Sequence, residues 1–258
     1  MNPVFVKTQN YHAFQDALKN MNGRGAEECQ LIVVDGEPGL GKTTILSKWA
    51  AENDCMFLRA KTEWNPSWMM GELLDDMRIQ QPHRHEARFK AALEGLTERA
   101  VLAENTGRQF AVVIDEADHI SSKQKLIETV RDLADISRVP FILVGMGKIR
   151  DNLTRFPQIA SRVSSYVRFS TADPSDVRLF LGEKCTVPVG PDLAEFIHRA
   201  TGGYNREIKE AIQSIERLGR RVEMANPDVG LSLKEMAGQH LINDRKSGRP
   251  IQVPGAAS

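Results

Sequence analysis

The 258-residue sequence lacks the features that define several classes of protein. No run of about 18 apolar residues occurs, so no transmembrane helix is predicted. The first ten residues have no apolar signal core, which predicts a cytoplasmic protein. Cysteine is scarce, and Cys29, Cys55 and Cys185 lie far apart without a C-x-x-C pair. We therefore expect buried free thiols in a reducing compartment, and neither a disulfide framework nor a zinc site.

An excess of charge of one sign is also missing. The 34 Lys and Arg residues equal the 34 Asp and Glu residues in number, which gives a formal net charge of zero. Proteins that coat nucleic acid through bulk positive charge are usually strongly basic. Any contact of this protein with DNA therefore requires a local basic patch.

The middle of the sequence alternates between short apolar runs and helical patterns. The apolar runs, often β-branched, predict strands at about 31–34, 55–58, 110–114, 141–144 and 166–169. Helical spacing of apolar residues predicts helices at about 41–53, 66–77, 85–104, 121–136 and 149–153. Strands that alternate with helices predict βαβ crossovers, and hence an α/β fold with a parallel sheet flanked by helices.

The last third of the sequence is organised differently. After Thr171 the strand pattern stops, and Asp173-Pro174 begins a helix with an N-cap residue and a proline in the first turn. Further helices are predicted at about 191–200, 205–220 and 232–241. We therefore expect an α/β domain at 1–171, a small helical domain at 172–243, and a polar, flexible tail at 244–258.

One segment matches the phosphate-binding motif G-x-x-x-x-G-K-[ST]. Its residues are Gly36, Glu37, Pro38, Gly39, Leu40, Gly41, Lys42 and Thr43, followed by Thr44. A predicted strand precedes the motif and a predicted helix follows it, as the motif requires. The glycines let backbone N–H groups surround phosphate oxygens, while Lys42 reaches the β- and γ-phosphates and the Thr43 hydroxyl binds Mg²⁺. The segment predicts a site for ATP and Mg²⁺.

Two acidic residues supply the second half of this site. Asp115 and Glu116 follow the apolar run 110–114, which brings them to the carboxyl end of a parallel strand, where α/β sheets bind their ligands. We expect Asp115 to hold Mg²⁺ through water, and Glu116 to orient and polarise the attacking water. The pair favours hydrolysis of ATP over binding alone.

Together these motifs resemble those of the AAA+ ATPases. In that family a segment similar to 115–118 is the Walker B motif and the helical domain is the lid, so the resemblance implies a P-loop AAA+ sheet with a C-terminal lid. Arg162 lies in a segment that resembles the box carrying the arginine finger. This implies that Arg162, or alternatively Arg155, enters the ATP site of a neighbouring subunit. The segment 202–206 resembles the sensor-2 motif, which implies that Arg206 contacts the γ-phosphate.

One position departs from the family pattern. Met146 follows the fourth predicted strand, where members generally carry the polar sensor-1 residue, so we expect slow hydrolysis that a partner stimulates. The Leu-Val-Gly strand end is similar to that of the AAA+ group that regulates DNA transposition. This resemblance implies a homo-oligomeric ring or filament on double-stranded DNA that selects the transposition target and recruits or stimulates a DDE transposase.

DNA contact is predicted from a local patch at 78–90. Arg84, Arg88 and Lys90 lie there beside a single acid, Glu86, and backbone contacts by such residues carry no sequence information, which suits a target selector. A solvated helix face is the alternative interpretation. Further candidates for DNA contact are Lys61, Lys148 and Arg150. Two other functions stay open: an ATP-gated interaction switch of a secretion-type assembly, and a helicase loader or replication accessory ATPase.

Two remaining features have simpler interpretations. Asp118 follows the acidic pair, and we expect it to cap a helix, with a role in coupling DNA to hydrolysis as the alternative. Arg245, Lys246 and Arg249 belong to the predicted tail, where we expect them to be solvated. Contact of these three with DNA or a transposase is the other interpretation.

Overall fold

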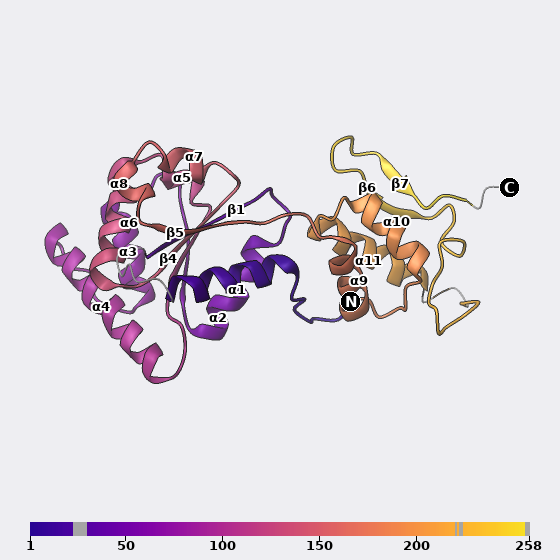
Figure 1. Ribbon diagram of the computed structural model, residues 1–258, viewed down its shortest axis with the longest axis horizontal. Coiled ribbons are helices and arrows are strands. Elements are labelled where there is room, and N and C mark those ends of the chain that lie inside the picture. Colours follow the sequence, from indigo (N-terminus) through magenta and orange to yellow (C-terminus); the bar gives the residue numbers. More distant parts are fainter. Residues whose placement is uncertain (23–29, 220, 222–223, 256–258) are drawn as a thin grey trace. The chain divides into compact units, whose positions relative to one another are not determined.

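The structure is a computed structural model that describes residues 1–22, 30–219, 221 and 224–255 (Figure 1). The chain divides into two compact units. The sheet unit consists of residues 13–38 and 42–169, and the helical unit consists of residues 1–12, 39–41 and 170–258. Of the cysteines, Cys55 is half-buried and Cys185 is buried, both as free thiols, while Cys29 lies outside the described residues.

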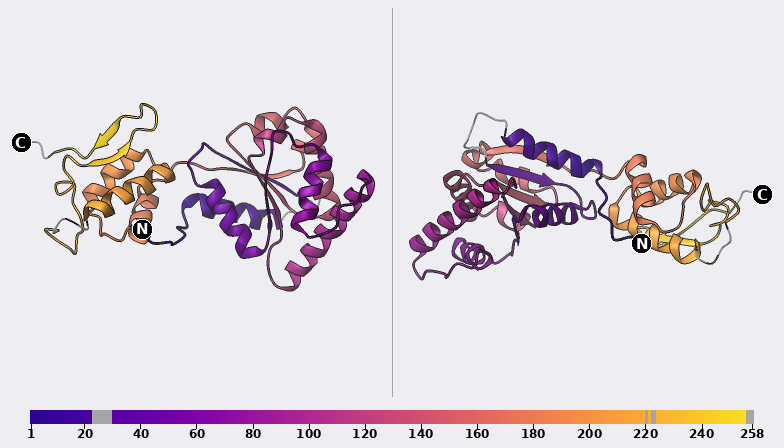
Figure 2. Two further views of the ribbon diagram at one scale, coloured as in Figure 1. Left: turned by 180° about the vertical axis from the view of Figure 1, so that it is seen from behind. Right: turned by 90° about the horizontal axis from the view of Figure 1, so that it is seen from below.

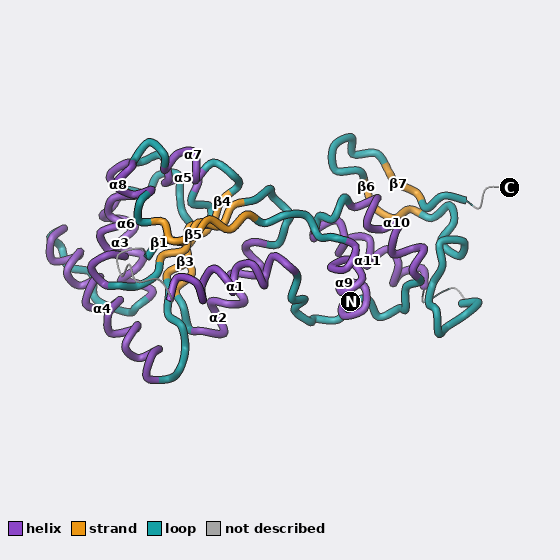
Figure 3. Tube along the Cα trace, viewed as in Figure 1, coloured by secondary structure: helices purple, strands orange, loops and turns teal. Residues whose placement is uncertain are grey.

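A five-stranded parallel sheet forms the centre of the sheet unit (Figure 3). Its strands, in the order β2-β3-β4-β1-β5, are β2 (Met56–Arg59), β3 (Val112–Asp115), β4 (Phe141–Gly145), β1 (Leu31–Asp35) and β5 (Val163–Arg168). Every residue of β3 and β4 is buried. Because successive residues of a strand face opposite sides of a sheet, burial of all of them means that both faces are covered. The predicted α/β fold with a parallel sheet is confirmed.

Helices surround this sheet, some of them packed on other helices and not directly on the strands (Figures 1 and 2). They are α2 (Lys42–Asn53), α3 (Pro66–Asp76), α4 (His85–Asn105), α5 (Asp118–Ser121), α6 (Gln124–Ser137), α7 (Ile149–Leu153) and α8 (Pro157–Ala160), preceded in the chain by α1 (Gln9–Asn22). The predicted helix at 121–136 corresponds to α6, which begins three residues later because the backbone of Lys123 is extended. The short α5 before it was not predicted from the sequence. Neither α1 nor α8 was predicted from the sequence.

The helical unit has its own core. It contains α9 (Pro174–Lys184), α10 (Pro191–Thr201) and α11 (Asn205–Gly219). Asp173 caps α9 as predicted, since its carboxylate accepts the N–H groups of Ser175 and Asp176. Buried side chains of all three helices, such as Phe180, Ile197 and Ile212, form one apolar cluster.

The C-terminal part of this unit differs from the prediction. An antiparallel pair, β6 (His240–Asn243) and β7 (Pro250–Gln252), replaces the expected end of a helix and the expected tail. The prediction of a helix at 232–241 is wrong, because the chain makes turns there and Gly238 has a φ of +74°, outside the helical region. Val253 is only 1% exposed and belongs to the core of the unit.

Among the described helices, none combines the length and the apolar character that crossing a lipid bilayer requires.

Candidate nucleotide-binding site

The predicted phosphate-binding loop connects β1 to α2. Gly39 and Gly41 have φ values of +94° and +85°, which glycine adopts without steric cost. The Lys42 side chain is buried and folds back into the loop, where its ammonium donates to the carbonyl oxygens of Gly36 at 2.5 Å and Glu37 at 2.8 Å. Burial lowers the pKa of Lys42, and the carboxylates of Asp115 and other nearby acids act in the opposite direction. The loop therefore holds a cation where phosphate oxygens would bind.

The two predicted magnesium ligands lie together. Thr43 is the second residue of α2, and Asp115 is the last residue of β3. The Thr43 Oγ1 hydroxyl donates to Asp115 Oδ2 at 2.8 Å. Mg²⁺ prefers hydroxyl, carboxylate and water oxygens, and a carboxylate this close to the hydroxyl can accept a hydrogen bond from a water on the same ion. The donor set therefore fits Mg²⁺ bound directly by Thr43 and through water by Asp115.

Glu116 is held in an ion pair that the sequence did not predict. Its carboxylate bonds to the guanidinium of Arg59, and His119 Nε2 lies 3.8 Å from its other oxygen. The hydrogen bond from Arg59 lowers the pKa of Glu116. Arg59 lies opposite Asp115 in the register of β2 and β3. The ion pair could therefore have been predicted only from the pairing of these two strands. In this arrangement the carboxylate is ionised and oriented toward Arg59.

Asp118 has a different role from the predicted one. It is the first residue of α5, and Ala117 precedes it without a side-chain cap, so the expectation of a helix cap is wrong. Its carboxylate accepts the N–H groups of Met146 at 2.6 Å and Lys148 at 3.2 Å, and thereby fixes the loop after β4. The Met146 side chain, at the predicted sensor-1 position, is 51% exposed.

The tip of the phosphate-binding loop, residues 39–41, groups with the helical unit. The Asn205 side-chain amide donates to the carbonyl of Leu40 at 3.0 Å, and the Arg206 N–H donates to the carbonyl of Gly39 at 3.3 Å. A Cβ on Gly41 would lie 2.6 Å from Asn205 Nδ2, so this position requires glycine. The predicted sensor-2 segment thus lies on the loop tip, with the Arg206 side chain exposed.

Arg162 lies at the amino edge of the sheet, opposite the carboxyl edge that carries the phosphate-binding loop. Its carbonyl accepts the N–H of Leu31, the first residue of β1, and its Nε lies 3.5 Å from Asp135 Oδ2. The phosphate-binding loop follows the last residue of β1, which is roughly 13 Å further along the strand. Arg162 is therefore remote from the loop of its own chain, and Arg155 is an exposed residue shortly before it.

The predicted DNA patch divides into exposed and engaged residues. Arg84 and Lys90 are exposed, with Lys90 Nζ 3.9 Å from a Glu94 carboxylate oxygen. The Arg88 guanidinium instead donates to the carbonyl and hydroxyl oxygens of Ser67 and to the carbonyl of Pro82, which ties the start of α4 to α3. The structure therefore gives Arg88 a structural role, and of these three predicted DNA contacts it leaves Arg84 and Lys90 accessible.

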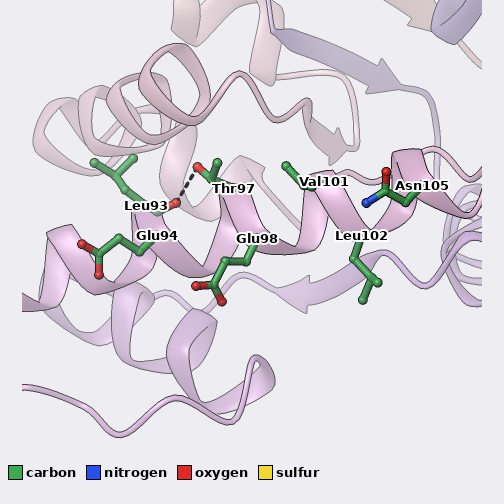
Figure 4. A pocket seen from close by; sticks show the side chains of 7 residues that line it. All are labelled: Leu93, Glu94, Thr97, Glu98, Val101, Leu102 and Asn105. Carbon is green, nitrogen blue, oxygen red and sulfur yellow. Dashed lines mark hydrogen bonds between the residues drawn. The ribbon is translucent and has the colours of Figure 1, made fainter.

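Further along α4 lies an apolar hollow (Figure 4). Its lining residues are Leu93, Glu94, Thr97, Glu98, Val101, Leu102 and Asn105. Val101 and Leu102 are 52% and 60% exposed. Large apolar side chains gathered on a surface are typical of protein contacts.

Comparison with known proteins supports the assignment made from the residues. A family model described as AAA domain matches residues 24–153. The ATP-dependent target DNA activator B of Escherichia phage Mu is 26% identical over 182 residues, which cover 68% of this chain and 54% of that protein, and its namesake from phage D108 gives the same values. This chain thus spans about half the length of the curated relatives it matches. The predicted resemblance to the transposition-regulator group of AAA+ ATPases is confirmed.

Solved structures with the same fold include two archaeal proteins. Cdc6p from Pyrobaculum aerophilum matches with a TM-score of 0.57 and 18% identity, over 85% of this chain and 65% of that one. A Walker-type ATPase of Pyrococcus abyssi matches with a TM-score of 0.59 and 14% identity, over 84% and 69%. At these identities the likeness concerns the fold alone, and it confirms the predicted P-loop α/β architecture.

Proposed function

This chain belongs to the AAA domain family, and we propose that it binds ATP with Mg²⁺ and hydrolyses it to ADP and phosphate. The observation that carries the proposal is the meeting of three side chains at the carboxyl edge of the sheet. Lys42 lies inside the glycine loop, and Thr43 is hydrogen-bonded to Asp115. A cation inside a loop of backbone amides, next to a pair of oxygen ligands, is the arrangement that nucleoside triphosphate binding needs.

Each residue has a defined task in this proposal. Lys42 exchanges its bonds to the loop carbonyls for bonds to the β- and γ-phosphates. Thr43 directly and Asp115 through water would hold Mg²⁺, which would neutralise charge on the phosphates. Glu116 orients the attacking water once its carboxylate has left Arg59, and the exposed Arg206 reaches the γ-phosphate. Slow basal turnover is expected from two features of the protein: the Arg59–Glu116 ion pair and the apolar Met146 at the sensor-1 position.

Assembly of several copies is part of the proposal. Arg162 lies at the edge of the sheet opposite its own phosphate-binding loop, so as an arginine finger it would serve the nucleotide of a neighbouring copy. Its ion pair with Asp135 would position it until the neighbour binds. Arginine in this role stabilises charge that develops during phosphoryl transfer.

We further propose that the assembly forms on double-stranded DNA and acts in transposition, by selecting a target and by recruiting or stimulating a DDE transposase. The similarity to a phage protein named ATP-dependent target DNA activator B supports this step. The exposed Arg84 and Lys90 support the DNA contact, because a repeated pair of cations in every copy adds up along the phosphate backbone.

Electron microscopy of the negatively stained protein with duplex DNA tests this function. The protein is compared in ATP with Mg²⁺, in ADP, and without nucleotide, and a Lys42→Ala variant serves as the matched control. Filaments or stacked rings that need DNA, ATP and Lys42 are the expected result. Dispersed particles in every condition, with ATP binding measured separately, would refute assembly on DNA and favour an ATP-gated protein-interaction switch, for which the apolar hollow on α4 is the surface.

A further inference from the structure

The turn between β6 and β7 places an arginine on the tip of the phosphate-binding loop, within the helical unit. A Cβ built on Gly39 would lie 2.9 Å from Arg245 Nη1, so the guanidinium rests directly against this glycine. Two residues of the sensor-2 region hold it there. Arg245 Nη1 donates to Glu207 Oε1 at 2.9 Å, and the guanidinium lies 4.1 Å from the centre of the Tyr204 ring. Arg245 therefore takes part in this cluster, although its side chain remains 33% exposed, and it does not belong to a free tail.

The carboxylate of Glu207 is the group whose charge Arg245 compensates. The Glu207 side chain is only 9% exposed, and its Oε2 has no hydrogen-bond partner among the described residues. This same oxygen lies 3.8 Å from the Cβ position of Gly39. A buried carboxylate is costly unless an opposite charge accompanies it. Beside a loop that receives a polyanion it would also repel the ligand. Arg245 is the cation that accompanies it.

We propose that Arg245 is a positioning residue of the nucleotide site, which neutralises Glu207 so that the loop tip accepts the phosphates of ATP. The proposal rests on the proposed ATP-binding function. In this proposal the nucleotide site includes a third part of the chain besides the phosphate-binding loop and the sensor-2 segment. This part is the β6–β7 turn, which determines the net charge beside Gly39. Loss of the Arg245 charge leaves the Glu207 carboxylate uncompensated, and ATP, which carries one more negative charge than ADP, loses more affinity.

Isothermal titration of the full chain with ATP and with ADP, in Mg²⁺, separates charge from packing. Arg245→Lys keeps the charge and is expected to bind ATP nearly as the wild type does. Arg245→Met keeps the apolar stem and removes the charge, and we expect about tenfold weaker binding of ATP, with a smaller loss for ADP and for either nucleotide at high salt. Adding Glu207→Gln to Arg245→Met is expected to restore ATP affinity to within about threefold of the wild type.

Controls make each outcome decisive. Arg249→Met changes the same charge at an exposed position of the same turn, and should leave affinity unchanged. Unchanged ATP binding by Arg245→Met would overturn the proposal, as would equal losses in the lysine and methionine variants without rescue by Glu207→Gln. If circular dichroism shows that Arg245→Met does not fold, the Glu207→Gln single variant tests the proposal. Weaker ATP binding by that variant would contradict the proposal, and equal or tighter binding would support it. A wild-type protein that binds no ATP, or a Lys42→Ala variant that binds normally, would instead refute the proposed function itself.

Discussion

Replacing Gly145 by alanine tests how Asp118 fixes the loop after β4. A Cβ at this position would lie 2.5 Å from both Asp118 Oδ2 and Ile149 Cδ1. Ile149 is fully buried, and overpacking of a well-packed core costs about 1–3 kcal/mol. The displaced Asp118 also loses its bonds to two backbone N–H groups, about 1 kcal/mol each once those groups regain water. We expect Gly145→Ala to destabilise the sheet unit by about 3–5 kcal/mol.

Tryptophan fluorescence reports this unit selectively. The three tryptophans of the chain, Trp49, Trp64 and Trp68, all belong to the sheet unit. Unfolding in urea, followed by their emission, therefore gives a transition for that unit, and the expected result for Gly145→Ala is a lower midpoint with an unchanged slope.

A double-mutant cycle separates the two parts of the cost. In an Asp118→Ala background the new methyl group of Gly145→Ala displaces no carboxylate, so we expect it to cost about 1–2 kcal/mol less than in the wild type. Purely additive losses, within about 0.5 kcal/mol, would show that Asp118 is not the group that the methyl displaces, and would refute the reasoning.

Four further predictions concern turnover, DNA binding and stability. Glu116→Gln should keep ATP binding and lower phosphate release by about 10²- to 10⁴-fold, and an unchanged rate would remove Glu116 from its role. Arg59→Ala should raise the pKa of Glu116, because the hydrogen bond from Arg59 lowers that pKa in the wild type. The acid limb of the pH–rate profile should therefore move to higher pH, and basal turnover near neutral pH should increase. An acid limb that does not move would contradict the pairing of Arg59 with Glu116. Arg84→Ala with Lys90→Ala should weaken duplex binding in a filter assay and reduce the salt slope by about 2 per copy, without a change in unfolding. Arg88→Ala should instead lower stability, because its bonds tie α4 to α3.

The parts that the sequence predicted well depend on local patterns. The glycine loop is recognisable because strand, turn chemistry and helix follow one another within the chain, and Asp173 with Pro174 marks the start of α9 in the same way. Asp115 could be placed because an apolar run ends at a known edge of a parallel sheet.

The rest depends on neighbours that are distant in sequence. Arg59 meets Glu116 only because β2 and β3 pair in register, and Asp118 reaches the loop after β4 only because Gly145 leaves room. The sequence predicts a tail around Arg245, because nothing near it indicates that Val253 is buried or that the turn returns to Tyr204. Such contacts are properties of the packed chain and leave no periodic signal.

The position of Arg162 at the amino edge of the sheet has a consequence for how the activity depends on concentration. In the proposed assembly, one chain carries the phosphate-binding loop of one site and the arginine finger of a neighbouring site, so that a single chain would complete neither. Below the protein concentration at which copies associate, ATP should be bound but hardly hydrolysed. Above it, each added copy completes a neighbour's site, so the rate per copy should climb before it levels off. DNA that gathers copies on one duplex would produce the same rise at a far lower amount of protein, and would therefore act as the signal that enough copies are present.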